Sequence, residues 1–240
     1  MLPPIFPRYS AEMNLKQAKD RILETSSIAR RIYGVKLTLR NGPTDASRWF
    51  LFNREKLKYS IKFNHTGLVL DMGSYLGEYT EVILKNNPQL TFWLYEPISE
   101  FFSVCANKFH NKENIVVHQK AVSADGRKFK MQIDGLRSRQ KSVNFSEGVT
   151  INSISIQEIF DSISEIQLVK MNIEGMEYEC LEQLIRTNSL IKAKYLLIQF
   201  HDLEKDSENR RDLLQKKMAK DFENIYSYEW MWELWMRKGE

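Results

Sequence analysis

Short apolar runs alternate with amphipathic stretches along most of the chain after residue 65. Five of these runs have the length of strands, and most segments between them have the periodicity of helices. The runs are Gly67–Asp71, Thr91–Glu96, Ile115–Gln119, Ile166–Asn172 and Lys194–Phe200. Strands that alternate with helices are typical of a parallel sheet covered on both faces. The pattern therefore predicts an α/β fold with a mostly parallel, twisted sheet.

Two segments depart from this alternation. Residues 127–154 contain short alternating runs broken by Asp134-Gly135 and Glu147-Gly148, which predicts an inserted hairpin. Residues 222–238 have the pattern of two strands joined by a tight turn, rather than that of a strand and a crossover helix. We therefore expect the sheet to end in a C-terminal antiparallel hairpin.

The first part of the chain has a different pattern. Residues 11 to about 33 have helical periodicity, and Gly34 is a plausible C-terminal cap for that helix. The sequence RNGPTDAS, residues 40–47, is rich in turn residues. We expect an N-terminal helical extension over residues 1–48 and one α/β domain over residues 49–240.

Composition narrows the class of protein. A chain of 240 residues with 42% hydrophobic and 28% charged residues suits one globular domain. The net charge of +4 is too small to argue for a nucleic-acid partner. No run approaches the roughly 18 apolar residues of a membrane span, and two cysteines do not suggest a disulfide framework. We expect a cytoplasmic protein without a membrane span, and a homodimer stays open.

The sequence VLDMGSYLGEYT, residues 69–80, marks the end of the first strand. Asp71 and two glycines, Gly73 and Gly77, follow the apolar run, and residues 78–84 have helical character. The spacing differs from the G-x-G-x-x-G of dinucleotide folds, and an acid at this turn would repel a phosphate. The turn instead favours a cationic group, such as an amino group or a sulfonium, and Gly73 lets the backbone approach it closely.

Two further strand ends suit a nucleoside. Glu96 ends the strand TFWLYEP, 23 positions after Gly73, where an acid can accept hydrogen bonds from both ribose hydroxyls. The sequence LVKMNIEGMEYECL is another apolar strand that leads into a polar turn and a helix. Together these elements indicate a ligand with a ribose and a positive charge but no phosphate, and S-adenosylmethionine fits that description.

At this point the chain resembles the FkbM family of S-adenosylmethionine-dependent methyltransferases, which have the class I Rossmann-like fold. VLDMGSYLGEYT matches the first motif, YEPISEFF the second, and AVSADG the turn after the third strand. INSISIQEIF with IQLVKMNIEGMEYECLEQL matches the most distinctive segment of the family, and YLLIQFHD matches its fifth strand. The resemblance covers roughly residues 66–204 and implies a methyltransferase with S-adenosyl-L-methionine as cofactor.

The resemblance also implies positions for the cofactor. Its amino-acid part would lie in the first motif, its ribose at Glu96 and its adenine near Ala121, and residues 172–177 would face the reacting centre. The implied cofactor-binding residues are Asp71, Gly73, Ser74, Tyr75, Gly77, Glu96, Pro97, Ala121 and Asn172. Asn172 stands where the family usually has an aspartate, and an amide cannot serve as a carboxylate base.

Methyl transfer to a hydroxyl requires a group that removes a proton. The candidates for the reacting centre are His201, Glu174 and Asn172. His201 is preferred as the base because it is the first titratable residue after the apolar strand LLIQF. A structural histidine and an acid that merely shapes the turn are the alternatives.

Other charged residues are candidates for binding the acceptor, namely Glu177, Asp202, Arg137 and Arg139. The arginines of the inserted hairpin could clamp a phosphate or carboxylate, although a solvated turn has the same composition. An acid such as Glu177 is also favoured at a helix start by the dipole alone. No cluster has convincing metal-ligand spacing, although Asn172, His201 and Asp202 could meet around one ion, so we expect no metal.

The resemblance thus predicts an O-methyltransferase that acts on a hydroxyl of a sugar, a glycan precursor or a small metabolite. The expected partner is a small-molecule or glycan acceptor. An N-methyltransferase, which needs less help from a base, is one alternative. A catalytically inactive cofactor-binding module of the same fold is the other, and Asn172 is the feature that suggests it.

Overall fold

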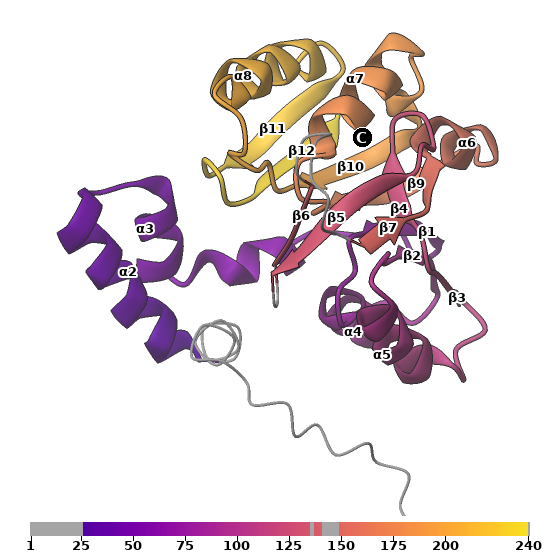
Figure 1. Cartoon of the computed structure of the whole chain (residues 1–240), viewed down its shortest axis with the longest axis horizontal. Coiled ribbons are helices and arrows are strands. Elements are labelled where there is room, and N and C mark those ends of the chain that lie inside the picture. Colours follow the sequence, from indigo (N-terminus) through magenta and orange to yellow (C-terminus); the bar gives the residue numbers. More distant parts are fainter. Residues whose placement is uncertain (1–25, 135–136, 141–148, 240) are drawn as a thin grey trace, which may run out of the picture.

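A seven-stranded sheet forms the centre of the computed structural model, which describes residues 26–134, 137–140 and 149–239 (Figure 1). The strand order is β11-β12-β10-β9-β1-β2-β3. The strands are β1 (Gly67–Met72), β2 (Leu90–Tyr95), β3 (Ile115–His118), β9 (Ile166–Met171), β10 (Ala193–Ile198), β11 (Phe222–Ser227) and β12 (Glu233–Arg237). The first five are parallel, and β12 runs antiparallel to both β10 and β11.

The predicted α/β fold is confirmed. Each of the five predicted parallel strands is present, with ends that differ by at most two residues. These runs were recognisable because their residues are largely buried, and in β9 every residue is buried. The C-terminal antiparallel hairpin is also present as β11 and β12.

Helices cover both faces of this sheet, as predicted. Figure 1 shows α4 (Glu78–Asn86) and α5 (Ser99–Phe109) on one face, with α6 (Ile156–Asp161), α7 (Glu177–Arg186) and α8 (Ser207–Met218) on the other. A short 3₁₀ helix, η2 (Leu190–Lys192), precedes β10. Neighbouring residues of β1 point to opposite faces, so Val69 and Leu70 belong to separate apolar layers.

An N-terminal pair of helices lies beside the sheet (Figure 1, indigo). The pair consists of α2 (Ser27–Asn41) and α3 (Asp45–Leu51), and the 3₁₀ helix η1 (Arg54–Tyr59) follows. Trp49 of α3 is fully buried in the same apolar layer as Val69. The predicted boundary at residues 48 and 49 therefore falls inside a helix that packs against the sheet, and the division into two domains stays a prediction.

The prediction that the N-terminal helix ends at Gly34 is wrong. α2 continues through this residue, and its C-terminal cap is Gly42, with φ of 76°. Gly34 lies where the two helices touch, since a β-carbon there would be 2.4 Å from the backbone nitrogen of Leu51. A cap and a close helix contact both favour glycine, so the sequence did not distinguish them. Residues 11–25 of the predicted helix lie outside the described residues.

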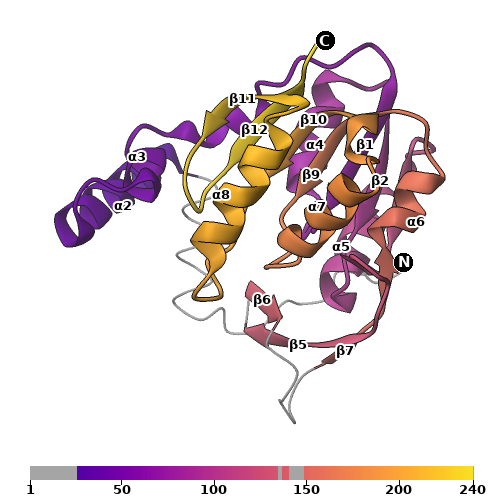
Figure 2. The ribbon, with the colours of Figure 1, turned by 90° about the horizontal axis from the view of Figure 1, so that it is seen from above.

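The inserted segment after β3 forms two small sheets. β4 (Ala121–Ser123) pairs in parallel with β8 (Ser153–Ser155). β5 (Phe129–Asp134) pairs antiparallel with both β6 (Arg137–Gln140) and β7 (Val149–Ile151). The predicted hairpin is therefore present, with β7 as an additional strand, and Figure 2 shows this unit next to the main sheet.

Two observations bear on the predictions from composition. Within the described ranges, no helix combines the length and the apolar character needed to cross a membrane. Cys105 and Cys180 are free and buried, in α5 and α7. The two thiols form no disulfide with each other, in agreement with the sequence.

Candidate functional site

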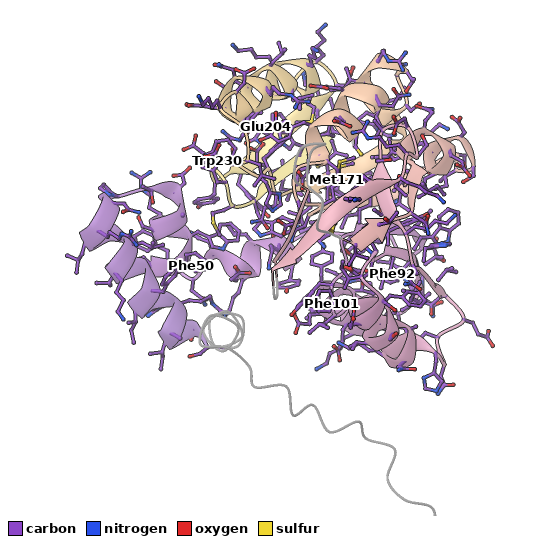
Figure 3. All side chains as sticks on the ribbon, viewed as in Figure 1. Phe50, Phe92, Phe101, Met171, Glu204 and Trp230 are labelled. Atoms are coloured by element: carbon purple, nitrogen blue, oxygen red, sulfur yellow. The ribbon has the colours of Figure 1, made fainter. Side chains whose placement is uncertain are left out.

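A cavity of about 530 Å³ lies at the carboxyl ends of the parallel strands, where ligands of open α/β sheets bind. Residues that follow β1, β2, β9 and β10 line it, together with residues of β5 and of the N-terminal helices. Figure 3 labels three lining residues from separate parts of the fold: Phe50 of α3, Phe101 of α5 and Trp230 of the β11–β12 connection. The cavity is therefore assembled from the whole length of the described chain.

The cavity brings together most of the predicted site residues. Those that line it are Gly73, Tyr75, Glu96, Pro97, Ala121, Asn172, Glu174, His201 and Asp202. Asp71, Ser74, Gly77 and Glu177 are not among the lining residues. The side chains of Arg137 and Arg139 lie outside the part of the structure that is described, so their predicted contact with an acceptor stays a prediction.

The turn after β1 is fixed by contacts within the protein. Gly73 has φ of 77°, and its N–H donates to the carbonyl oxygen of Tyr95 at 2.9 Å. A β-carbon on Gly73 would lie 2.0 Å from the backbone oxygen of Asn172. Glycine is therefore required here by the neighbouring strand end, in addition to any ligand that lies against it.

The cation that faces Asp71 belongs to the protein itself. Lys170 Nζ lies 2.8 Å from Asp71 Oδ1, and Thr80 Oγ1 donates to Asp71 Oδ2 at 2.8 Å. The Asp71 side chain is completely buried. This corrects the expectation that Asp71 meets a cationic ligand group directly, because an internal ion pair already occupies the carboxylate.

Ser74 and Gly77 also act within the turn. Ser74 N donates to the Tyr95 carbonyl oxygen at 3.2 Å, and Gly77 N donates to the Ser74 carbonyl oxygen at 2.8 Å. A β-carbon on Gly77 would lie 2.6 Å from the ring of Phe109 in α5. Both residues were predicted to contact the cofactor. In this geometry they shape the turn and do not line the cavity.

Glu96 is a buried carboxylate held in place by backbone donors. Tyr75 N donates to Oε2 and Ile98 N donates to Oε1, each at 2.9 Å. Burial raises the pKa of Glu96 to about 7, against the opposing effects of these two donors and of Lys170. Each carboxylate oxygen can accept a second hydrogen bond, so two acceptor sites remain for a pair of hydroxyls.

His201 lines the cavity and pairs with the buried Glu177, which does not line it. His201 Nδ1 lies 2.9 Å from Glu177 Oε1, and His201 Nε2 lies 3.7 Å from Glu174 Oε1. Glu177 is fully buried and accepts backbone hydrogen bonds from Ile173 N at 2.7 Å and Gly175 N at 2.8 Å. Glu177 was predicted to bind the acceptor, but its carboxylate faces His201 and this turn.

Asn172 carries a buried acceptor without a partner. Its Oδ1 is inaccessible to water and receives no hydrogen bond from the described residues. Its backbone N–H donates to the Met72 carbonyl oxygen at 3.0 Å, which fixes the residue at the end of β9. An unsatisfied acceptor in a cavity wall fits a ligand that donates an N–H or O–H.

Several aromatic residues of the cavity were missed in the sequence. Tyr33, Phe50, Trp230 and Trp232 line one side of it, and we call this set the aromatic wall. The predicted tight turn of the C-terminal hairpin is in fact a connection of five residues between Ser227 and Glu233. The connection contains three large apolar residues, and these could have indicated that it packs against the protein, because a turn that faced water would not favour them.

The aromatic wall joins distant parts of the chain. Glu229 N donates to Asp45 Oδ2 at 2.9 Å, and the rings of Trp49 and Tyr228 meet edge to face at 5.2 Å. Lys58 Nζ lies 5.3 Å from the centroid of the Trp232 ring. The N-terminal helices therefore hold the β11–β12 connection against the cavity.

The described residues contain no group of three or more His, Cys, Asp or Glu side chains placed to hold a metal ion. Asn172, His201 and Asp202 all line the cavity. Two glutamates of the preceding turn and helix, Glu174 and Glu177, lie beside the His201 ring. The arrangement is thus that of a histidine flanked by acids.

Comparisons with known proteins agree with this geometry. The family model described as "Methyltransferase FkbM domain" matches residues 71–230. The crystal structure of a methyltransferase FkbM from Methylobacillus flagellatus is similar with a TM-score of 0.51 and 16% identity, over 87% of this chain and 59% of that one. This chain therefore spans less than two thirds of that relative. No curated protein sequence matches the chain.

Two further solved structures have weaker similarity to this chain. Methanococcus jannaschii fibrillarin, a pre-rRNA processing protein, has a TM-score of 0.45 and 11% identity, over 74% of this chain and 69% of that one. TrmK of M. capricolum, in complex with S-adenosyl-homocysteine, has a TM-score of 0.44 and 12% identity, over 79% and 69%.

The match to the FkbM family model is the evidence for the family of this chain, and the fold supports it. The family model covers two thirds of the chain, from Asp71 in β1 to Trp230 beyond β11. The fold of this chain is also similar to that of the FkbM structure, with a TM-score of 0.51. The chain belongs to the FkbM family of methyltransferases.

Proposed function

We propose that this methyltransferase uses S-adenosyl-L-methionine to methylate a hydroxyl of a sugar, a glycan precursor or another small metabolite. The observation that carries the proposal is that His201 lines the cavity and its Nδ1 lies 2.9 Å from Oε1 of the buried Glu177. A hydroxyl needs a base during methyl transfer, and a histidine held by a carboxylate can serve as that base.

Three features support the cofactor. Glu96 has two acceptor positions left for the hydroxyls of a ribose. Asn172 Oδ1 is a buried acceptor that suits a donor on the ligand. Gly73, Pro97 and Ala121 line the cavity with small or apolar surfaces. The bound cofactor supplies a methyl group activated by a positively charged sulfur, so positioning and exclusion of water contribute much of the acceleration.

The proton chemistry follows from the contacts of His201. Glu177 already accepts two backbone N–H groups and acts toward the imidazole as an acceptor, which places a proton on His201 Nδ1. Nε2 is then the ring nitrogen with the lone pair, which takes the proton of an acceptor hydroxyl. The resulting imidazolium lies next to the carboxylates of Glu177 and Glu174, which stabilise its charge.

The aromatic wall supports an acceptor with a ring. The faces of Trp230 and Trp232 are large apolar surfaces, and Glu55 and Lys58 place polar groups in the same side of the cavity. A sugar ring combines apolar C–H faces with hydroxyls at its edge. The net charge of +4 gives no reason to prefer a nucleic acid as the acceptor.

The cytoplasm stays the proposed location, and the free buried thiols of Cys105 and Cys180 are compatible with a reducing compartment. A homodimer stays a prediction. The location and the oligomeric state are properties of the whole protein, and the experiment below depends on neither.

The test combines binding and turnover. Titration calorimetry with S-adenosylmethionine and S-adenosylhomocysteine measures cofactor binding, and release of S-adenosylhomocysteine over a panel of hydroxyl and amine acceptors measures turnover. Binding with turnover on hydroxyl acceptors supports the proposal. Turnover on amines alone would favour an N-methyltransferase, and binding without turnover on any acceptor would favour an inactive module. Absence of binding would overturn the proposed cofactor.

A further inference from the structure

A buried lysine supports the turn that follows β1. Lys170 is 5% exposed, in a strand whose other residues are also buried. It stands opposite Asp71 in the parallel register of β9 and β1. Its Nζ lies 2.8 Å from Asp71 Oδ1 and donates to the Gly73 carbonyl oxygen at 2.7 Å. One ammonium group thus joins the acid of the strand to the first glycine of the turn.

The stability of the sheet does not by itself explain this lysine. Taking an ammonium and a carboxylate out of water is costly, and apolar residues in place of a buried ion pair are often as stable or more so. An apolar side chain at position 170 would continue the pattern of β9, in which Leu168, Val169 and Met171 are fully buried. The contact of Lys170 with Gly73 is the additional feature that an apolar residue would not provide.

The turn is held from both sides. From the side of β2, the Tyr95 carbonyl oxygen accepts from the backbone N–H groups of Gly73 and Ser74. From the side of β9, Lys170 holds the Gly73 carbonyl oxygen, and Asn172 packs against the Gly73 α-carbon. Since Gly73 lines the cavity, the lysine sets the position of a backbone group that a ligand would meet.

We propose that Lys170 is a positioning residue for the amino-acid end of the cofactor. It fixes the Gly73 carbonyl, and with it the turn next to the place where the carboxylate of that end would lie. The inference rests on the proposed use of S-adenosylmethionine. The adenosine end would meet Glu96, Pro97 and Ala121, which Lys170 does not hold by any contact described above.

Two probes separate the ends of the cofactor. S-adenosylhomocysteine has the amino-acid group, whereas 5′-methylthioadenosine keeps the adenine, ribose and sulfur but lacks it. Lys170 also lowers the pKa of Glu96, so binding is measured at about pH 9, where the Glu96 carboxylate stays ionised. In Lys170→Met, affinity for S-adenosylhomocysteine should fall about tenfold or more, while affinity for 5′-methylthioadenosine stays within about threefold.

The control is Lys85→Met, which removes an exposed lysine of α4 and should leave both affinities unchanged. Lys170→Met leaves Asp71 buried without its cation, so the double variant Lys170→Met/Asp71→Asn restores neutrality and favours a folded protein. The Gly73 carbonyl still lacks its donor in the double variant. The selective loss of S-adenosylhomocysteine affinity should therefore persist there.

Each result of these binding measurements either supports or contradicts the positioning role of Lys170. Equal losses for both probes, or an unchanged ratio of the two affinities, would contradict a positioning role. A double variant that regains the ratio of the parent would also contradict it, since the charge of Asp71 alone would then explain the loss. A parent protein that binds neither probe would refute the proposed cofactor itself, and this result is distinct because it involves no variant.

Discussion

Glu96 illustrates how burial and hydrogen bonding prepare one carboxylate for a ligand. Burial raises its pKa to about 7, and two backbone donors hold both oxygens. Ribose hydroxyls donate hydrogen bonds, so we expect S-adenosylhomocysteine to bind the ionised form. Its affinity should be steady above about pH 7 and fall about tenfold per pH unit below, because a proton must leave before binding. Titration calorimetry across this range measures the effect.

The matched variant is Glu96→Gln, which keeps the shape of the side chain and removes its titration. Its affinity should be lower and should no longer change between about pH 6 and pH 8. A pH profile that persists in Glu96→Gln would assign the titration to another residue. Unchanged affinity in Glu96→Gln would show that the ribose lies elsewhere.

His201 is the residue whose loss should affect chemistry most. His201→Ala should lower turnover by about 100-fold or more, because a positioned base is lost. Its affinity for S-adenosylhomocysteine should change little, since the base acts on the acceptor. Turnover and calorimetry on the same preparation test both parts. Activity within about threefold of the parent would rule out His201 as the base, and Glu174 would be examined next.

Glu177 should contribute to stability as well as to the orientation of His201. Its carboxylate faces two backbone donors and the imidazole, and an amide has only one acceptor oxygen for them. Glu177→Gln should therefore lower the free energy of unfolding by about 1–3 kcal/mol, as measured by urea denaturation. The control Glu179→Gln removes only a surface ion pair with Arg127 and should cost at most about 1 kcal/mol.

Among the elements, the turn between β1 and α4 gives the sharpest prediction. Gly73→Ala should strongly destabilise the fold, because the new β-carbon would meet the Asn172 oxygen at 2.0 Å and the residue has φ of 77°. Gly42→Ala is the control, since Gly42 has φ of 76° but nothing within 4 Å of the added carbon. Gly42→Ala should cost about 1–3 kcal/mol, because φ of 76° with ψ of −176° is a backbone conformation that side chains rarely adopt, and Gly73→Ala should cost clearly more. Equal losses in thermal or urea unfolding would show that the contact is unimportant.

The elements were predictable where a local pattern determined them. The five parallel strands are buried runs, and the acid and glycines after β1 marked a turn from their order alone. The partner of Asp71 was not predictable in this way. Lys170 is visible within an apolar run, but its contact depends on the register of β1 against β9, two strands about 100 residues apart in the chain.

The same difference between local patterns and contacts of distant segments applies to the site residues. Glu96, Asn172 and His201 could be predicted to line the cavity because they come one to three residues after buried strands, and the carboxyl ends of parallel strands lie at the same edge of a sheet. The aromatic wall was missed because its members are far apart in sequence, from Tyr33 to Trp232. Gly34 was misread because a close contact between helices and a helix cap favour the same residue.

For the whole molecule, the aromatic wall should determine affinity for the acceptor without affecting the cofactor. Trp232→Leu should raise KM for the acceptor by about tenfold, because a large apolar contact is lost. Affinity for S-adenosylhomocysteine should stay within about twofold. Trp93→Leu is the control, since Trp93 of β2 does not line the cavity. A fall in cofactor affinity with unchanged KM would place the acceptor on another side of the cavity.

The contact between Asp45 and Glu229 joins positions 184 residues apart. During synthesis, the strands that carry Gly73, Glu96, Asn172 and His201 leave the ribosome before the β11–β12 connection does. Contacts of such long sequence separation form late, because a large loop must close first. The nascent chain should thus acquire its cofactor side before its acceptor side, and a chain that stops short of residue 222 would lack the aromatic residues of that connection. If the aromatic wall binds the acceptor as proposed, methyl transfer should begin only after the β11–β12 connection has folded.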